Sequence, residues 1–196
     1  MNLIVHRRNT LSELLATPTR YGVEVDIRSW GDRLIIHHDA FLAGEDFAKW
    51  LENYRHRTLI LNVKEEGLED RLLDLMKKNN IKDFFFLDQS FPFLIKTANR
   101  GERRCAVRVS EYEHLNSALA LAGKIEWVWV DCFTRFPLSA EEAEKLRQAG
   151  FKLCLVSPEL QQRGSSHEIV ALRTLLDDLR IVPDAVCTKI PEYWET

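Results

Sequence analysis

Charged side chains interrupt one apolar run near the start of the chain. Glu24, Asp26 and Arg28 occupy every second position of the run "VEVDIRSW", and alternate residues of a strand share one face. Two carboxylates on one face provide hard oxygen ligands, which suit Mg²⁺ or Ca²⁺ better than zinc. A carboxylate pair alone is weak evidence for a metal site, so the interpretation depends on which other polar residues lie near it.

Polar residues also end several other apolar runs. Active sites of parallel barrels lie at the C-terminal ends of the strands, so these residues are candidates for one common site. Histidine suits proton transfer because its reference pKa is about 6.5, and lysine or arginine can neutralise an anionic substrate. In chain order the candidates are His6, Arg7, His38, Asp39, Asn62, Lys64, Glu66, Asp88, Glu111 and Asp131.

Nine short apolar runs, most of them rich in β-branched or aromatic residues, predict strands along the whole chain. The turn signal "SWGDR" joins the second and third runs, which predicts a hairpin or one long bent strand. Counted as one, these two leave eight β units. The runs lie at residues 3–5, 22–27, 33–38, 58–64, 83–88, 105–110, 126–131, 152–157 and 184–190.

Amphipathic segments between the runs predict helices. They cover residues 44–55, 67–80, 114–124, 139–150 and 167–182, the last being stopped by Pro183. This β-α alternation favours a parallel sheet, and the count favours a compact, closed (β/α)8 barrel with short loops over an open doubly wound sheet. No glycine-rich phosphate loop follows a strand, and no linker divides the chain. We therefore expect one domain over residues 1–196.

Composition restricts the partners and the compartment. The net charge is -3 and apolar residues make up 45% of the chain, and without a basic stripe we expect no nucleic-acid partner. No apolar stretch is long enough to span a bilayer, and the N-terminal run is too short for a secretory signal. We expect a cytoplasmic protein whose four cysteines are buried free thiols. The oligomeric state stays open.

The order of the polar residues resembles the glycerophosphodiester phosphodiesterase family, within the PLC-like phosphodiesterase superfamily. That family has His-Arg after its first strand, then Glu-x-Asp in its second, and His-Asp shortly afterwards. Here the corresponding residues are His6-Arg7, Glu24-Val25-Asp26 and His38-Asp39, and Asn9-Thr10 matches a frequent Asn-Thr. The resemblance is strong over residues 4–64 and looser in the segments 89–94 and 185–191.

The resemblance implies a TIM-barrel hydrolase of lipid metabolism that acts on a glycerophosphodiester-like small phosphodiester. It implies that His6 and His38 exchange protons with the nucleophile and the leaving group. It also implies that Arg7 and Lys64 bind phosphate oxygens, and that Glu24, Asp26 and Asn62 hold a divalent cation, Mg²⁺ or Ca²⁺. Attack by water would give hydrolysis, whereas attack by a substrate hydroxyl would give a cyclic phosphate.

Several positions depart from the family pattern. Asn62 replaces the third acidic metal ligand, so Asn62 or Glu66 would complete the metal site. Arg8 replaces a small glycine, Lys189 replaces an acid, and the subdomain often inserted after His-Asp is absent. These departures motivate an alternative function: a catalytically degenerate barrel that binds a phosphorylated ligand or a protein partner. Arg28 is expected either below the site as an inward-pointing cation or paired with Asp26.

Overall fold

The computed structural model describes residues 1–163 and 166–195. The chain groups into two compact units, an N-terminal unit of residues 5–102 and a C-terminal unit of residues 1–4 and 103–196. That the two units form the single domain expected over residues 1–196 stays a prediction. Strand β1 (Asn2–Val5) belongs almost wholly to the C-terminal unit, where the Asn2 N–H donates to the Asp184 carbonyl at 2.8 Å.

Strand β2 is the centre of the sheet in the N-terminal unit. It pairs antiparallel with β3 and parallel with β5, while β3 also pairs with β4 and β5 with β6. Gly31, with φ +62°, lies in the tight turn between β2 and β3, so the hairpin is confirmed and the single bent strand is wrong. The strands are β2 (Gly22–Trp30), β3 (Arg33–Ile36), β4 (Glu45–Asp46), β5 (Leu59–Val63) and β6 (Phe84–Leu87).

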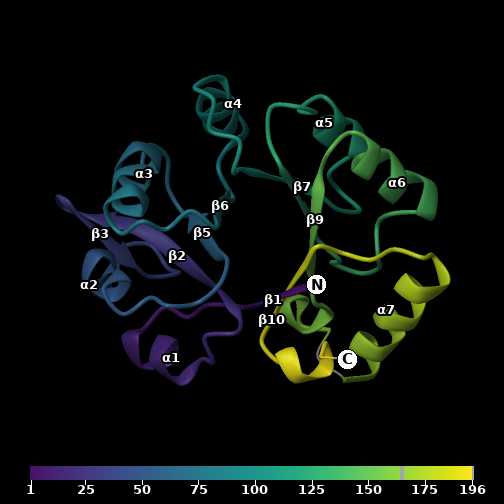
Figure 1. Cartoon of the computed structure of the whole chain (residues 1–196), viewed down its shortest axis with the longest axis horizontal. Coiled ribbons are helices and arrows are strands. Elements are labelled where there is room, and N and C mark those ends of the chain that lie inside the picture. Colours follow the sequence, from purple (N-terminus) through teal and green to yellow (C-terminus); the bar gives the residue numbers. More distant parts are fainter. Residues whose placement is uncertain (164–165, 196) are drawn as a thin grey trace. The chain divides into compact units, whose positions relative to one another are not determined.

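Four helices accompany these strands, and Figure 1 shows α2 and α3 beside β2 and β3. They are α1 (Leu11–Ala16), α2 (Phe47–Leu51), α3 (Glu69–Lys78) and α4 (Phe91–Asn99). Helices α2 and α3 fall inside the predicted segments 44–55 and 67–80 but are shorter. Helix α1 was not expected, although Thr10 and Glu13 form a capping box at its start.

The C-terminal unit contains a parallel sheet in the order β10-β9-β8-β7. Its strands are β7 (Ala106–Val109), β8 (Trp127–Val130), β9 (Lys152–Val156) and β10 (Ala185–Thr188). The connecting helices are α5 (Leu115–Leu119), α6 (Ala140–Gln148) and α7 (Ser166–Asp178), with 3₁₀ turns η1 (Pro158–Gln161) and η2 (Pro191–Tyr193). Helix α7 ends at Asp178, before the predicted stop at Pro183, and a turn follows it.

The α/β fold class is confirmed, because each of the nine apolar runs contains a strand and helices lie between most of them. Parallel ladders join β2, β5 and β6 in one unit and β7 to β10 in the other. The ladders among the described residues do not establish a closed cylinder. The compact (β/α)8 barrel is therefore confirmed only as an α/β fold with parallel strands and helical connections.

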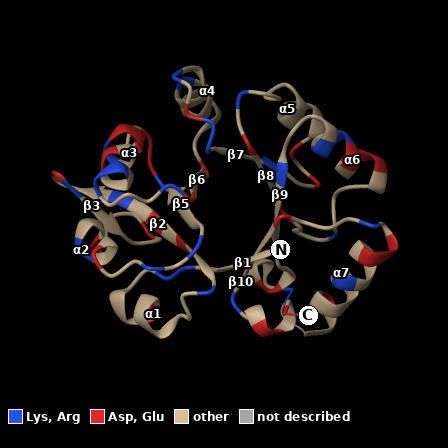
Figure 2. Cartoon of the chain, viewed as in Figure 1, with Lys and Arg blue, Asp and Glu red and all other residues tan. Residues whose placement is uncertain are grey.

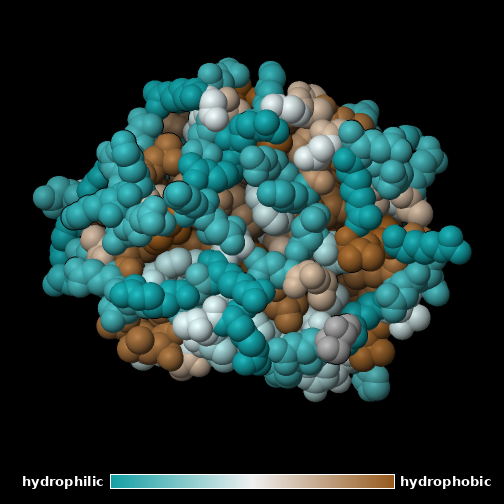
Figure 3. Space-filling model, viewed as in Figure 1, coloured by the Kyte–Doolittle hydropathy of each residue, from teal (hydrophilic) through white to brown (hydrophobic). Residues whose placement is uncertain are grey.

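All four cysteines are buried free thiols, as predicted. Figure 2 shows that lysine, arginine and acidic residues are spread over the helices and loops of both units. On the face shown in Figure 3, hydrophilic side chains predominate and hydrophobic ones form separate patches. No helix in the described part of the chain has the length and apolar character needed to cross a bilayer.

Gly44 lies in the loop between β3 and β4, where the chain passes close to the backbone. A Cβ atom at this position would lie 2.2 Å from the carbonyl oxygen of Ile36. A backbone oxygen cannot rotate away, so Gly44→Ala must displace β3 or the loop. We expect the substitution to destabilise the protein by roughly 1–3 kcal/mol and to lower the melting temperature by several degrees, measured by calorimetry. Ala43→Ser, at the exposed neighbour, is the control, and equal melting temperatures would contradict the prediction.

Candidate active site

Two buried carboxylates on β2 form the centre of the candidate site. The side chains of Glu24 and Asp26 are fully buried, with 0% exposure. They share one face of β2, while Val23 and Val25 occupy the other face and pack in the core. Figure 2 shows this acidic segment on β2. Because a buried charge is costly without partners, the contacts of these two carboxylates decide what the site can do.

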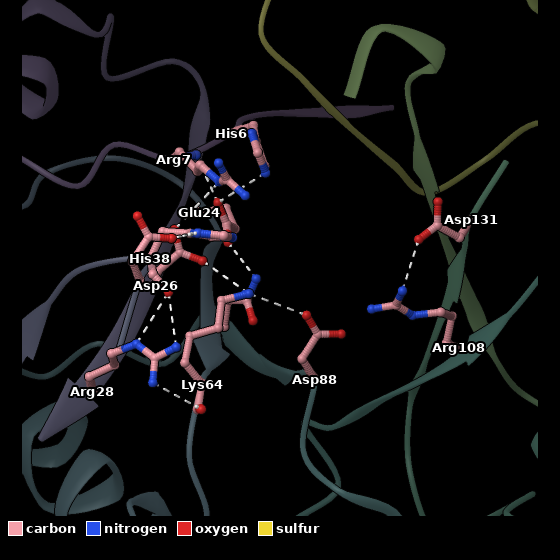
Figure 4. Close-up of polar contacts among 12 residues, drawn as sticks. His6, Arg7, Glu24, Asp26, Arg28, His38, Lys64, Asp88, Arg108 and Asp131 are labelled. Atoms are coloured by element: carbon pink, nitrogen blue, oxygen red, sulfur yellow. Dashed lines mark hydrogen bonds and ion pairs between the residues drawn. The ribbon is translucent and has the colours of Figure 1, made fainter. Parts of the chain in front are cut away.

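Glu24 accepts hydrogen bonds from two sides. Its Oε1 accepts from Asn62 Nδ2 at 2.8 Å, and its Oε2 accepts from the backbone N–H of Arg7 at 2.7 Å. The His6 ring also faces this carboxylate, with Nε2 at 3.8 Å from Oε2 (Figure 4). Residues that follow β1 and lie on β5 therefore meet at Glu24, as the predicted site requires.

The charge on Glu24 is only partly compensated. Burial, and then the neighbouring charge of Asp26, raises the pKa of Glu24 to about 7, although hydrogen bonds from Asn62 and Arg7 and the charge of Lys64 lower it. Two carboxylates that share a buried site disfavour each other's ionised form. A further cation at this position would relieve the repulsion.

Asp26 has more cationic neighbours than Glu24. Lys64 Nζ lies 3.1 Å from its Oδ1, and Arg7 Nε lies 3.6 Å from its Oδ2. Asn9 Nδ2 donates to Oδ2 at 2.7 Å, and Asn9 Oδ1 accepts from the Asp26 N–H at 3.1 Å. Lys64 also lies 3.5 Å from Asp88. Lys64 thus pairs with Asp26 and Asp88. Asn9 is a further site residue, whose contact with Asp26 strand alternation does not predict.

Two site residues have left-handed backbone conformations. Arg7 has φ +52° and Asp88 has φ +59°, a region that non-glycine residues rarely adopt. At Arg7 this conformation accompanies two contacts with the carboxylate pair: its N–H donates to Glu24, and its guanidinium approaches Asp26. Strained conformations of this kind are concentrated at functional sites.

The chain at His38 is attached to β2 through its backbone, and the His38 ring is held by Asp39. The His38 Nδ1 lies 2.7 Å from Asp39 Oδ1, and this hydrogen bond is the main cause that lowers the pKa of Asp39. The His37 N–H donates to the Asp26 carbonyl at 3.0 Å, which fixes the start of this segment. The His38 side chain is 42% exposed, and among the described residues its ring has no contact with Glu24 or Asp26. Its Nε2 is therefore the ring atom left for a ligand.

Neither Arg28 nor Glu66 has the contacts with the carboxylate pair that the sequence suggests. Arg28 donates to the backbone carbonyls of His38 and Lys64, so it forms neither an ion pair with Asp26 nor a free cation below the site. Glu66 is exposed in the turn after β5, and no contact joins it to Glu24 or Asp26 within residues 1–163 and 166–195. Of the two candidates for a third oxygen ligand, only Asn62 contacts the carboxylate pair.

The donor atoms at this site are of the kind that bind a hard divalent cation. Asn62 is only 6% exposed, and its Oδ1 is buried without a hydrogen-bond partner in the described part of the chain. Such an orphaned acceptor beside two carboxylates fits a cation with oxygen ligands. In the same described residues, no three His, Cys, Asp or Glu side chains gather as a metal site, so an ion here needs the amide oxygen.

The predicted candidates of the C-terminal unit have structural partners. Burial acts to raise the pKa of Glu111, yet hydrogen bonds from the loop at Thr134 and Arg135 bring it down to about 2. The Asp131 carboxylate accepts from Arg108 Nη1 at 3.2 Å, a pair that Figure 4 also draws, and from Gln161 Nε2 at 2.6 Å. Both acids stabilise loops at strand ends, which is a capping role.

No family model matches the sequence, and no curated protein matches it. Among solved structures, a glycerophosphodiester phosphodiesterase from Agrobacterium tumefaciens is similar over 98% of both chains, with a TM-score of 0.72 and 14% identity. A glycerophosphoryl diester phosphodiesterase from Parabacteroides distasonis is similar over 98% of this chain and 85% of its own, with a TM-score of 0.64 and 10% identity. The chain has the glycerophosphodiester phosphodiesterase fold.

The glycerophosphodiester phosphodiesterase fold alone does not select one chemistry. A tryptophan synthase α-subunit from Pyrococcus furiosus is also similar, over 95% of this chain and 86% of its own, with a TM-score of 0.58 and 12% identity. Folds of this kind carry many activities through different residues at the strand ends. The function of this chain must therefore be inferred from the side chains around Glu24 and Asp26.

Proposed function

We propose that the protein is a divalent-cation-dependent phosphodiesterase that hydrolyses a glycerophosphodiester-like small phosphodiester. The observation that supports this proposal best is the fully buried pair of Glu24 and Asp26, in contact with His6, Arg7 and Lys64. Acids, an imidazole and two cations of this kind meet the needs of phosphodiester cleavage, in which negative charge gathers on the phosphate oxygens.

Glu24, Asp26 and Asn62 would hold the cation, Mg²⁺ or Ca²⁺. A bound divalent ion would neutralise negative charge on the phosphate and polarise its oxygens. The only partly compensated charge of Glu24 and the orphaned Oδ1 of Asn62 support this assignment. With two carboxylates and one neutral amide, the site should bind the ion more weakly than a site with three carboxylates.

Arg7 and Lys64 would bind the non-bridging oxygens of the substrate phosphate. In the structure both cations contact Asp26, and Lys64 also approaches Asp88. When a divalent ion balances the carboxylates, these long side chains can turn towards the phosphate without leaving a buried charge unpaired. Lys64 has a side-chain exposure of 16%, so its ammonium group is close to solvent.

His6 and His38 would carry the proton transfers. The carboxylate of Asp39 holds Nδ1 of His38, which leaves Nε2 to accept or donate a proton. His6 faces Glu24 through its Nε2. One histidine takes a proton from the attacking hydroxyl or water, and the other gives a proton to the departing alkoxide. A positioned acid or base typically contributes about 10²- to 10⁴-fold to the rate.

Phosphorus NMR of the products tests the proposal. The protein is incubated with glycerophosphocholine and Mg²⁺ or Ca²⁺, or with EDTA. We expect cleavage only with the cation, and a phosphomonoester resonance where water is the nucleophile. A cyclic phosphate resonance would instead identify a substrate hydroxyl as the nucleophile. Absence of cleavage with every cation would overturn the proposal and favour the degenerate barrel that binds a phosphorylated ligand or a protein partner.

Millimolar Mg²⁺ or Ca²⁺ should also raise the melting temperature. An ion at 100 times its dissociation constant adds about 2.7 kcal/mol of stability, a shift of several degrees for a chain of this size. Asn62→Asp is the informative variant, because a third carboxylate should lower the melting temperature without the ion and enlarge the shift with it. Glu66→Asp is the matched control. A larger shift in the control than in Asn62→Asp would show that Asn62 is not a ligand.

A further inference from the structure

Arg28 connects two segments that carry proposed active-site residues. Its Nε and Nη2 donate to the carbonyl oxygen of His38 at 3.2 and 2.9 Å, and its Nη1 donates to the carbonyl oxygen of Lys64 at 3.4 Å. Figure 4 shows the guanidinium between the two carbonyls. One side chain of β2 therefore holds two neighbouring segments, the one that follows β3 and the one that follows β5.

These contacts begin where the regular ladders of β2 end. The β2–β3 ladder reaches Ile36, and the β2–β5 ladder reaches Val63. Beyond them, the His37 N–H donates to the Asp26 carbonyl and the Lys64 N–H to the Ile27 carbonyl, each at 3.0 Å. The His38 and Lys64 carbonyls lie past these last backbone bonds. The Arg28 side chain supplies the donors that the sheet no longer provides.

We propose that Arg28 is a positioning residue that fixes the distance between the His38 segment and the Lys64 segment. The proposal rests on the proposed function, in which His38 transfers a proton and Lys64 binds the phosphate. Both acceptors are backbone carbonyls, so Arg28 holds the peptide units directly and acts on the two side chains through them. Reactive groups displaced by about 1 Å can lose on the order of 10²-fold in rate.

Arginine suits this role because of its geometry. The planar guanidinium presents five N–H donors in fixed directions and can bond two acceptors on different sides at once. A lysine ammonium keeps the charge but is a single point on a flexible stem, so it cannot reproduce the three bonds. If Arg28 acts through its charge alone, for example by attracting an anionic substrate, lysine should replace it. If it acts by position, lysine should not.

The turn after β5 has a second attachment to β2. The Ser29 N–H donates to the Glu65 carboxylate, which holds the turn whether or not Arg28 is present. Without the guanidinium, the peptide units of His38 and Lys64 should therefore become more mobile, while the turn after β5 stays attached to β2 through Glu65. For this reason we expect Arg28 variants to fold, with moderate losses of stability.

Steady-state kinetics of Arg28→Lys and Arg28→Met with glycerophosphocholine and the activating cation test the proposal. We expect kcat to fall roughly 10- to 100-fold in both variants, with KM changed by no more than about 2-fold. Arg33→Lys and Arg33→Met, on an exposed arginine of β3, are matched controls and should keep wild-type kinetics. Melting curves of each variant confirm folding, and Arg28→Lys decides the outcome where Arg28→Met unfolds.

The outcomes separate the two proposals. An active wild type with an unimpaired Arg28→Lys overturns the positioning role and leaves the phosphodiesterase proposal intact. A raised KM at constant kcat overturns it as well, because Arg28 would then act on substrate binding. A wild type without phosphodiesterase activity overturns the proposed function first, and the role of Arg28 with it.

Discussion

Replacing Glu24 with glutamine is expected to abolish phosphodiester cleavage and to raise the melting temperature of the metal-free protein at pH 8. The loss of activity follows because the variant lacks one of the two charged ligands of the proposed cation site. The gain in stability follows because the folded protein no longer buries two neighbouring carboxylates. Opposite effects on activity and stability are typical of a site that is strained for function.

The sign of the stability change follows from the pKa of Glu24. This pKa is raised from 4.5 to about 7 by burial and by Asp26, so the folded wild type binds the proton more tightly than the unfolded chain. Its contribution to stability is complete below pH 4.5 and is lost as the pH rises through 7. At pH 8 the ionised carboxylate costs on the order of 3 kcal/mol, and the advantage of the glutamine variant should shrink towards pH 5.

Glutamine can keep both neighbours of Glu24 satisfied. Its amide oxygen can accept from the Arg7 N–H, and its NH₂ group can donate to Asn62 Oδ1 after the Asn62 amide turns over. Part of the gain is lost because the charge of Lys64 then faces Asp26 alone. We therefore expect a rise in melting temperature of roughly 3–6 °C in EDTA at pH 8.

Differential scanning calorimetry of wild type and Glu24→Gln in EDTA, at pH 5 and pH 8, measures this effect. Glu66→Gln removes an exposed carboxylate from the same region and should change neither activity nor stability. If Glu24→Gln melts below the wild type at pH 8, the carboxylate is well compensated in the folded protein. A buried acidic pair with unrelieved repulsion would then be the wrong description of the site.

The strands were predictable because their signal is local. Runs such as "DFFFLD" and "EWVWVD" combine β-branched or aromatic residues with polar ends, and each contains a strand. Strand β4 has only two residues and exists because β3 offers it an edge, which no local pattern reveals. Helix α4 lies outside the predicted helical segments, and Pro92 in its first turn is a residue that a sequence reading takes as a sign of a turn or loop. Helix α1 had a usable signal in its capping box.

The site was predictable where strand alternation determines direction. Glu24 and Asp26 share a face because they are two residues apart on β2, and Asn62 reaches them because β5 pairs with β2 in register. Contacts made beyond the strand ends were not predictable. The path of the chain after His38 decides where Arg28 donates, and the turn after β5 decides that Glu66 is exposed. Strand periodicity does not extend into such turns.

His6→Ala and His38→Ala are each expected to lower kcat for glycerophosphocholine by about 10²- to 10⁴-fold while the protein stays folded. Neither ring is part of the apolar core: the side-chain exposures are 15% and 42%. Melting temperatures should therefore stay within a few degrees of the wild type. His167→Ala, on an exposed position of α7, is the matched control and should keep full activity.

A second substrate can assign the two histidines to different steps. The p-nitrophenolate leaving group of bis(p-nitrophenyl) phosphate departs without a proton, whereas the alcohol released from glycerophosphocholine needs one. The variant that lacks the general acid should therefore recover much of its rate with the nitrophenyl ester, while the variant that lacks the general base should stay slow with both substrates. Equal losses on both substrates in both variants would mean that neither histidine protonates the leaving group. Wild-type rates in both variants would remove the two imidazoles from the mechanism.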